Sequence, residues 1–291
     1  MPPGIMDGTV TRFAPSPTGL LHLGHAHSAL FAHSFTQGGA GDGRFLLRIE
    51  DIDPGRCRPE FGTAIFEDLA WLGLSWEEPV RRQSDHLGDY RAAAGRLEAM
   101  GVLYPCFCTR REIREEIARM GGAPQGPDGP LYPGTCRNLP AAEREVRLAR
   151  GDSHALRLDV EKALELTGPL AWTDRGAGRQ QARPELLGDV ALSRKDAPAS
   201  YHLAVTVDDH LQGVTLVTRG LDLFPSTHIH RLLQALLGYA TPDYWHHRLI
   251  EDETGQRLAK RADSRSIRAY RDQGLSPAEV RRLAEGGTLQ P

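Results

Sequence analysis

Short apolar runs alternate with longer segments of helical periodicity along the first hundred residues. The runs Thr9 to Phe13 and Arg44 to Ile49 are short and apolar enough to be buried strands. Helical spacing of apolar residues follows, from about Leu23 to Phe35, from Phe61 to Leu72 and from Ser84 to Met100. Strands alternating with helices at this spacing predict an α/β fold with a Rossmann-type parallel sheet.

The middle of the chain has a different character. Residues 104–137 hold three clustered cysteines and a loop rich in Gly and Pro, which cannot form a core element, so we expect an insertion there. Residues 172–187 have no clear period. Elsewhere the pattern predicts helices over Thr109–Met120, Ala141–Arg150 and Thr227–Leu237, and strands over Ser153–Val160, Tyr201–Val207 and Val214–Thr218.

Composition narrows the class of protein. The 291 residues are 40% hydrophobic and 25% charged, which is typical of a soluble globular protein, and no apolar run reaches membrane-spanning length. The formal net charge of -3 argues against a nucleic-acid coat protein, although a local basic patch remains compatible with it. The N-terminus lacks a secretory pattern and no heptads occur, so we expect a cytoplasmic monomer without a membrane partner.

The first strand, turn and helix carry the clearest candidate chemistry. His22 and His25 stand at the predicted helix start, where unpaired N–H groups and the helix dipole attract phosphate. Gly24 between them allows a ligand to approach the backbone. The alternative is a βα unit with two exposed histidines.

Acidic and basic groups also follow predicted strands. Glu50 ends the second strand, where ligands of open α/β sheets bind, although a solvated acidic turn is equally compatible with the pattern. Asp208 and His210 follow the predicted strand over Tyr201–Val207, where they are candidates for contacts to a ribose or for support of the residues that touch a ligand.

Three of the four cysteines are candidate metal ligands. Cys106, Cys108 and Cys136 offer three soft ligands, whereas structural zinc takes four, so zinc and free thiols both stay open on residue chemistry alone. Tyr132, four residues before Cys136, is an unusual fourth candidate because its phenol ionises only near pKa ~10. Cys57 is expected to be a small buried hydrophobe.

Five motifs in order resemble the glutamyl-tRNA synthetases of class I. They are Arg12-Phe-Ala-Pro-Ser-Pro-Thr-Gly-Leu-Leu-His-Leu-Gly-His25 with the "HIGH" signature, Phe45-Leu-Leu-Arg-Ile-Glu-Asp-Ile-Asp53, Tyr201-His-Leu-Ala-Val-Thr-Val-Asp-Asp-His210, Val217-Thr-Arg-Gly-Leu-Asp222 and Arg257-Leu-Ala-Lys-Arg261 in place of "KMSKS". Residues 189–196 also resemble that family's strand back into the catalytic domain. The last motif departs from the family pattern, because Arg257 replaces a lysine and Ala259 a serine.

The resemblance implies an ATP-dependent ligase that activates L-glutamate, with Mg²⁺ on the ATP. It implies catalytic roles for His22, His25 and Lys260, and ATP binding by these three together with Gly24. It implies glutamate binding by Arg12, Phe13, Ala14, Pro15, Ser16, Glu50, Tyr201 and Arg219. It also implies one structural zinc ion held by Cys106, Cys108, Tyr132 and Cys136.

About thirty residues follow the last motif, too few for an anticodon-binding domain. The chain therefore resembles most closely the truncated branch of that family, which activates glutamate without tRNA. Members of this branch then esterify glutamate onto queuosine in the anticodon loop of tRNA(Asp). We expect a catalytic domain over 1–100 and 188–245, a zinc-containing α+β subdomain over 101–187, and the signature loop with short helices over 246–291.

Three alternatives stay open, one close to the favoured function and two from other functional classes. One is a minimal synthetase that charges the acceptor end of tRNA(Glu). The second is a small-molecule adenylate-forming enzyme or nucleotidyltransferase without RNA, against which the basic run from Arg257 to Arg271 argues. The third is a non-catalytic RNA-binding paralogue, which predicts a degraded site.

Overall fold

The computed structural model describes residues 8–36, 43–120, 122–127, 129–195, 197–250 and 265–286. The strands are β1 (Val10–Phe13), β2 (Arg44–Ile49), β3 (Glu77–Arg82), β4 (Leu103–Cys106), β5 (Gln125–Gly126), β6 (Gly129–Pro130), β7 (Ala155–Leu158), β8 (Ala171–Asp174), β9 (Gly178–Gln181), β10 (Leu216–Gly220) and β11 (Asp243–His247). The helices are α1 (Leu23–Ser34), α2 (Pro59–Trp71), α3 (Leu87–Ala99), α4 (Arg110–Arg119), α5 (Ala141–Ala149), α6 (Val160–Thr167), α7 (Tyr201–Leu211), α8 (Ser226–Leu237), α9 (Ile267–Asp272) and α10 (Pro277–Ala284). Short 3₁₀ turns precede α3, follow β9 and follow β10.

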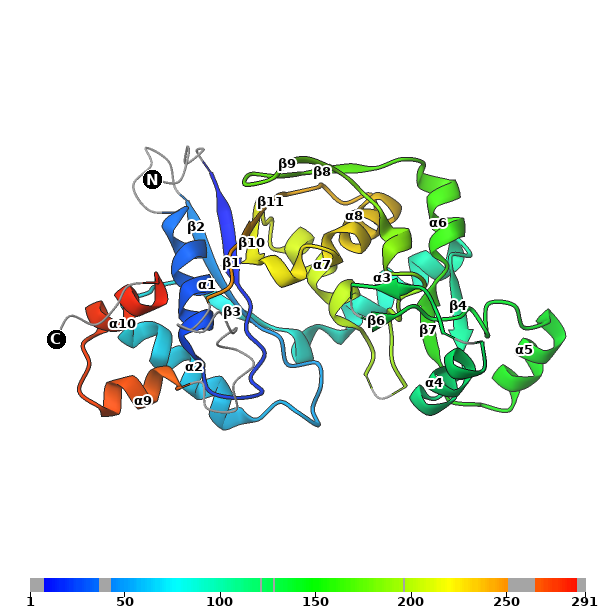
Figure 1. Cartoon of the computed structure of the whole chain (residues 1–291), viewed down its shortest axis with the longest axis horizontal. Coiled ribbons are helices and arrows are strands. Elements are labelled where there is room, and N and C mark those ends of the chain that lie inside the picture. The colour runs from blue at the N-terminus through cyan, green and yellow to red at the C-terminus, as the bar shows by residue number, and fades with distance from the viewer. Residues whose placement is uncertain are drawn as a thin grey trace.

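Two sheets meet at the centre of an elongated molecule (Figure 1). Strands β1, β2 and β3 are parallel, and so are β10, β11 and β8, after which β9 adds an antiparallel edge. The sheets are joined where the Val10 amide donates to Thr215 Oγ1 at 2.9 Å and the Thr215 amide donates to the Val10 carbonyl at 3.0 Å. The predicted α/β class with a parallel sheet is therefore confirmed.

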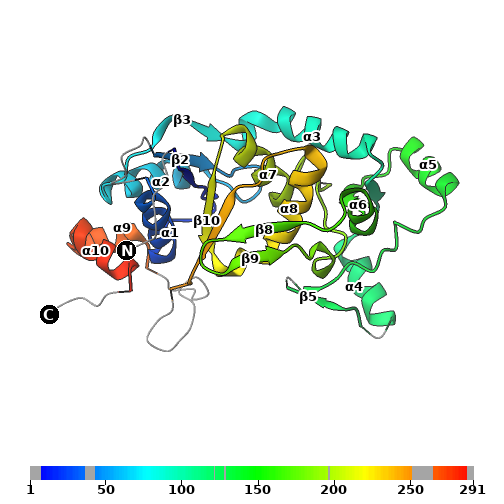
Figure 2. The ribbon, with the colours of Figure 1, turned by 90° about the horizontal axis from the view of Figure 1, so that it is seen from above.

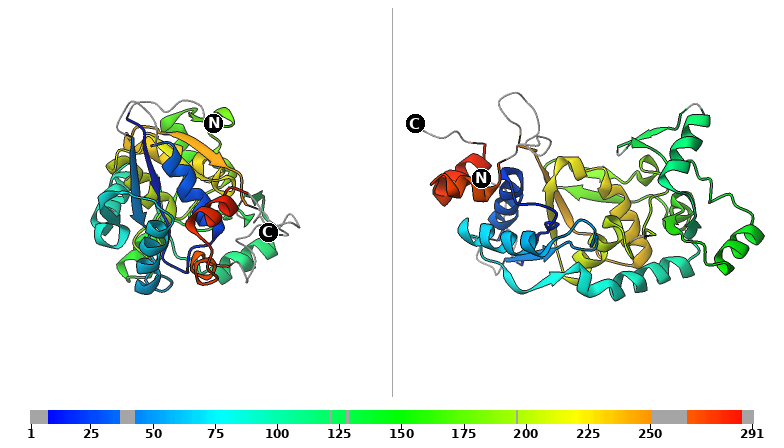
Figure 3. Two further views of the ribbon diagram at one scale, coloured as in Figure 1. Left: turned by 90° about the vertical axis from the view of Figure 1, so that its left-hand side faces the viewer. Right: turned by 90° about the horizontal axis from the view of Figure 1, so that it is seen from below.

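Separate groups of helices cover the two halves. Helices α1, α2, α9 and α10 bury apolar side chains with the first sheet, and α10 lies beside α1 (Figure 3). Leu23, Ala26 and Leu30 are buried at helical spacing on α1, as the periodicity predicts. Helices α3, α6, α7 and α8 form the second core, and α3 runs along one side of the molecule towards it (Figure 2).

The strand predicted over Tyr201–Val207 is wrong, because these residues begin helix α7. Its β-branched residues favour a strand locally. However, every residue from Leu203 to Asp209 is buried, so the helix lacks the polar face that makes a helical period visible in a sequence. Consequently Asp208 and His210 do not end a strand.

Two further differences lie in residues 155–195. In place of the strand expected over 189–196, residues 189–195 contain one isolated bridge, between Ala191 and Arg157. The region without a clear period forms the β8–β9 hairpin, and β8 bonds to β11 through Tyr244 and Asp174. The predicted domain boundaries stay predictions.

None of the helices in the described part of the chain combines the length and the apolar character needed to span a bilayer.

Candidate functional site

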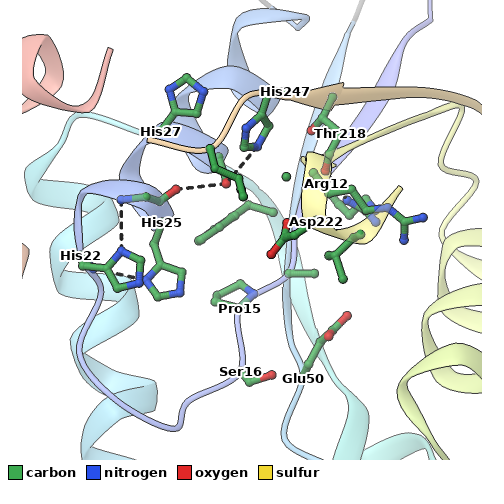
Figure 4. Close-up of a pocket in the computed structure, with 18 of the residues that line it drawn as sticks. Arg12, Pro15, Ser16, His22, His25, His27, Glu50, Thr218, Asp222 and His247 are labelled. Atoms are coloured by element: carbon green, nitrogen blue, oxygen red, sulfur yellow. Dashed lines mark hydrogen bonds between the residues drawn. The ribbon is translucent and has the colours of Figure 1, made fainter. Parts of the chain in front are cut away.

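The carboxyl ends of β1, β2 and β10 meet around one cavity of about 500 Å³. The loop after β1 is held there, because the Glu50 amide donates to the Pro15 carbonyl at 3.0 Å. Eleven of the predicted site residues line this cavity: Arg12, Phe13, Ala14, Pro15, Ser16, His22, Gly24, His25, Glu50, Tyr201 and Arg219. Figure 4 labels Arg12, Pro15, Ser16, His22, His25 and Glu50 among them. Sequence reasoning thus identified a set that folding brings together; Lys260 lies outside the described residues.

The two signature histidines cap helix α1 and touch each other. The Gly24 amide donates to His22 Nδ1 at 3.1 Å and the His22 amide donates to His25 Nδ1 at 3.2 Å, which leaves both Nε2–H groups for a ligand. Their ring centroids lie 3.8 Å apart. Burial lowers the pKa of both rings, that of His25 to about 3 with help from His22, so both are neutral donors at pH 7.

Gly24 has a steric reason to be glycine. A Cβ at this position would lie 3.0 Å from Cε1 and 3.1 Å from Nδ1 of the His22 ring, closer than side-chain contacts normally come. The His22 ring would have to move away from its capping position. The small residue therefore serves the packing of the two histidines as well as access for a ligand.

A buried ionic network supports one wall of the cavity. Asp209 of α7 accepts from Arg12 Nε at 3.0 Å and from Arg48 Nη1 at 2.8 Å. Arg48 is fully buried and also donates from Nη2 to Glu50 Oε1 at 3.2 Å. Burial raises the pKa of Glu50, and Arg48 and Arg12 offset only part of the effect. Asp209 of helix α7 thereby contacts Arg12 of β1 directly and is connected to Glu50, which follows β2, through Arg48.

Arg219 of β10 has a different environment. Its Nη1 donates to Tyr201 Oη and to His230 Nδ1, both at 3.1 Å, its Nη2 donates to Thr227 Oγ1 at 2.6 Å, and its Nε donates to His246 Nε2 at 3.1 Å. No carboxylate lies within 4.0 Å of this guanidinium among the described residues. Among the residues that the structure describes, this buried cation of the cavity thus has no anionic partner.

Sequence reasoning missed several residues of the cavity wall and its support. Thr218 and Asp222 stood inside a quoted motif without a role, and His27, Ser28 and His247 had no signal of their own. Ser28 Oγ and His247 Nε2 lie 3.0 Å apart and connect α1 to β11.

Two suggested contacts lie elsewhere. Asp208 is buried between Arg81, Gln83 and Tyr90, and His210 stacks on Tyr239 at 3.8 Å between ring centroids. Neither lines the cavity, so the suggested ribose contacts are not supported. Asp208 has the supporting position that was the other suggestion, because its Oδ2 lies 3.7 Å from Nε of Arg48. The neighbouring Asp209 contacts both Arg12 and Arg48.

The three clustered cysteines come together around Tyr132. The sulfur atoms of Cys106, Cys108 and Cys136 lie within 4.8 Å of one another, and Tyr132 Oη is 3.4 Å from Cys106 Sγ and 3.6 Å from Cys108 Sγ. Tetrahedral zinc with bonds of about 2.3 Å needs sulfur atoms about 3.8 Å apart. Cys108 and Cys136 at 3.4 Å are close to that spacing, so these four side chains fit a metal site.

The protonation of this cluster is shared between its thiols. A hydrogen bond between Cys106 and Cys136 raises the pKa of the Cys106 thiol and lowers the pKa of the Cys136 thiol. The guanidinium of Arg157 lies 3.8 Å from the centroid of the Tyr132 ring.

The fourth cysteine, Cys57, is partly exposed, so the prediction that it is a small buried hydrophobe is wrong.

The family model "tRNA synthetases class I (E and Q), catalytic domain" matches residues 9–285. The chain belongs to this family. The glutamyl-Q tRNA(Asp) synthetase of Rhodobacter capsulatus is 49% identical over 282 residues, which cover 94% of this chain and 99% of that relative. The glutamate–tRNA ligase of Coprothermobacter proteolyticus is 39% identical, over 92% of this chain and 56% of that protein.

The solved structures agree with the fold. A glutamate tRNA ligase from Elizabethkingia meningosepticum, in complex with its amino acid, superposes with a TM-score of 0.73 at 28% identity. The alignment covers 92% of this chain and 54% of that one, so the chain spans about half the length of that ligase. The predicted resemblance to class I synthetases is confirmed.

Proposed function

We propose that the protein activates L-glutamate with ATP without tRNA, and transfers glutamate to the queuosine base in the anticodon loop of tRNA(Asp). The observation that carries the proposal is the cavity in which Arg12, Glu50, Tyr201 and Arg219 meet the capping histidines. The identity to the Rhodobacter glutamyl-Q tRNA(Asp) synthetase, 49% against 39% for the Coprothermobacter glutamate–tRNA ligase, favours this branch of the family.

Glutamate presents two carboxylates and one ammonium group. Guanidinium groups suit carboxylates, and a carboxylate suits ammonium, so we assign the amino group to Glu50 and the carboxylates to the Arg12 and Arg219 side of the cavity. Phe13, Ala14, Pro15 and Ser16 form the adjoining wall. The enclosed charges orient the amino acid before it reacts.

Activation joins a carboxylate oxygen of glutamate to the α-phosphorus of ATP, and the bond to pyrophosphate breaks. We assign the Nε2–H groups of His22 and His25 to the phosphate oxygens on which charge builds, because both are preformed neutral donors at a helix N-terminus. Lys260 and Gly24 complete the proposed ATP site, and Mg²⁺ would accompany the ATP phosphates. The role of Lys260 stays a prediction from the sequence.

We further propose that Cys106, Cys108, Cys136 and Tyr132 hold one structural zinc ion. Three thiolates and a phenolate would saturate a tetrahedral ion, which would then stabilise the fold and leave no open position for chemistry. Metal analysis of the purified protein tests this assignment. One equivalent of zinc, lost in Cys136→Ala, supports it, and protein that stays metal-free after incubation with zinc contradicts it.

ATP–pyrophosphate exchange with L-glutamate in the absence of tRNA tests the first half of the proposed function. We expect exchange with L-glutamate and none with L-glutamine. Exchange that requires tRNA would instead indicate a synthetase of the tRNA-charging kind, and glutamate binding without exchange would favour a non-catalytic relative.

The acceptor is tested with labelled glutamate and three purified tRNAs. We expect transfer to queuosine-containing tRNA(Asp) and none to tRNA(Asp) that lacks queuosine. Charging of tRNA(Glu) at its 3′ end would overturn the proposed acceptor and favour a minimal glutamyl-tRNA synthetase. The monomeric state and the cytoplasmic location stay predictions.

A further inference from the structure

Arg219 is aimed into the cavity by four acceptors that carry no formal charge. Tyr201, Thr227, His230 and His246 take four of its five N–H groups. The fifth, on Nη2, has no partner within the described part of the chain. Because Tyr201 Oη accepts from Arg219, the hydroxyl proton of Tyr201 is left to donate elsewhere. One guanidinium N–H and one phenol O–H thus remain for a carboxylate in the cavity.

The hydrogen bond from Arg219 to His246 requires one tautomer of the imidazole. Nε2 of His246 can accept from Arg219 Nε only when the ring proton is on Nδ1. Nδ1 lies 2.7 Å from Oδ2 of Asp174, the last residue of β8, and an ionised carboxylate can only accept. Asp174 therefore places the ring proton on Nδ1 and leaves the Nε2 lone pair to Arg219 Nε at 3.1 Å, with Thr227 Oγ1 at 3.2 Å from the same nitrogen.

Asp174 is itself ionised and fixed. Its Oδ1 accepts from the Gly176 and Ala177 amides at 2.8 Å each, within the turn of the β8–β9 hairpin. Burial opposes ionisation, but the hydrogen bond to His246 and these amides outweigh it and keep the pKa of Asp174 below its ordinary value. Burial lowers the pKa of His246, so its ring is neutral and its tautomer decides what it accepts.

His230 and His202 form a second pair, in which a ring nitrogen of His230 also accepts a hydrogen bond from Arg219. His230 Nδ1 accepts from Arg219 Nη1, so its proton must be on Nε2, which lies 3.2 Å from His202 Nδ1. Burial lowers the pKa of both rings, that of His202 to about 4. Two independent chains of hydrogen bonds thus present lone pairs to the same guanidinium.

We propose that Asp174 is a positioning residue for amino-acid recognition, which holds His246 in the tautomer that aims the Arg219 guanidinium at a carboxylate of the substrate. The residue does not line the cavity and acts entirely through His246. This inference rests on the proposed function, since it assigns the Arg219 carboxylate site to glutamate. A hairpin from the middle of the chain thereby determines the hydrogen-bonding direction in a site built from both halves.

Asp174→Asn is the decisive substitution. The amide oxygen of Asn can still accept from the turn, whereas its NH₂ group donates to His246 Nδ1 and moves the ring proton to Nε2. An N–H of His246 then faces an N–H of Arg219. Nitrogen-15 chemical shifts of the His246 ring, assigned by their loss in His246→Gln, report the tautomer without any assay. We expect Nδ1–H in the wild type and Nε2–H in Asp174→Asn; an unchanged tautomer overturns the proposal.

A double-substitution cycle tests the consequence for glutamate. The amide oxygen of His246→Gln can accept from Arg219 in either background, so Asp174→Asn should matter only when His246 is present. In pyrophosphate exchange we expect Asp174→Asn to raise the KM for glutamate about 10- to 100-fold alone, and less than about threefold in the His246→Gln background. The KM for ATP should stay unchanged in both. Loss of the bond from the His246 amide to Asp174 Oδ2, 3.2 Å long, is common to both backgrounds and cancels.

Asp243→Asn is the matched control. Asp243 lies on β11 and pairs with Arg175 at 3.1 Å beside the same hairpin, without contacting Arg219 or lining the cavity. Its KM for glutamate should stay within about threefold of the wild type. Equal effects of Asp174→Asn in both backgrounds, or an equal effect of Asp243→Asn, would mean a merely structural role and overturn the proposal. A wild type without glutamate-dependent exchange would instead refute the proposed function, while the nitrogen shifts still decide the tautomer.

Discussion

The cavity contains two arginines of similar burial and opposite surroundings. Arg12 is 4% exposed and Arg219 is 6% exposed, and both line the same wall. Asp209 neutralises Arg12, whereas the acceptors that the described residues offer to Arg219 are all neutral. A buried charge without a counter-ion is unfavourable unless a ligand supplies one. Under the proposed function, Arg12 would both support the site and border the substrate, whereas Arg219 would be the cation that depends on the substrate for its counter-charge.

The largest expected effect concerns the neutralised side. Asp209→Asn should lower the free energy of unfolding by about 3–5 kcal/mol at pH 7, because it leaves Arg12 and Arg48 buried with one carboxylate fewer. Urea unfolding measures this, and Asp243→Asn, a more exposed pair, should change the same quantity by less than about 1 kcal/mol. Equal losses in the two variants would remove the distinction between the arginines.

The other side should respond in activity. Arg219→Met should lower kcat/KM for glutamate in pyrophosphate exchange roughly 10²- to 10³-fold, since a carboxylate would be left without its cation. Its free energy of unfolding should stay within about 1 kcal/mol of the wild type, because the substitution removes an uncompensated buried charge. A variant that is strongly destabilised, or that retains full activity, contradicts the proposed role of Arg219.

Glu50 separates function from stability within the ionic network. Burial raises the pKa of Glu50, so its ionised form destabilises the folded state above that pKa, and the penalty disappears as the pH falls below it. Glu50→Gln should therefore be at least as stable as the wild type at pH 7, yet bind glutamate about 10- to 100-fold more weakly. For the wild type, the KM for glutamate should rise as acid protonates Glu50. If the KM of Glu50→Gln for glutamate rose over the same acidic pH range, the titration of another group would explain the pH dependence.

The pKa of Asp209 is shifted in the opposite direction from that of Glu50, so its effect on stability has the opposite dependence on pH. Its pKa is lowered because Arg12 and Arg48 outweigh the effect of burial. The stability that it contributes is therefore present above the ordinary aspartate pKa and is lost as the pH falls through the lowered one. This acid-induced loss of stability should be absent from Asp209→Asn and present in Glu50→Gln, when the free energy of unfolding is measured as the pH is lowered.

The smallest expected effect is on the ligand-bound protein. Glutamate at ten times its Kd should raise the free energy of unfolding by about 1.4 kcal/mol, visible as an increase in Tm. Glutamine at the same concentration should not, because it offers no second carboxylate. Arg219→Met should abolish the increase in Tm. An equal increase with glutamine would show that Arg219 does not distinguish a carboxylate from a neutral amide.

An element could be predicted from the sequence when its own apolar and polar residues show the pattern of a strand or a helix. Strands β1 and β2 were predictable as short apolar runs that are buried almost throughout, and helix α1 was predictable from the helical spacing of its apolar residues. The segment from Tyr201 was not, because a helix buried on all sides shows no polar face. The β8–β9 hairpin is rich in Gly, Gln and Arg and depends on its pairing with β11, which no local pattern reports.

The sequence by itself determined the family, the α/β class and eleven residues of the cavity wall, because the signature motifs place these side chains in the loop after β1, at strand ends and at two helix starts. Only the tertiary structure decided the state of those side chains. Asp209 and Asp174 act on Arg12 and Arg219 across 197 and 45 positions of the chain, directly in one case and through His246 in the other. Charge compensation and tautomer choice depend on distances of about 3 Å between such residues. These distances exist only after the chain has folded.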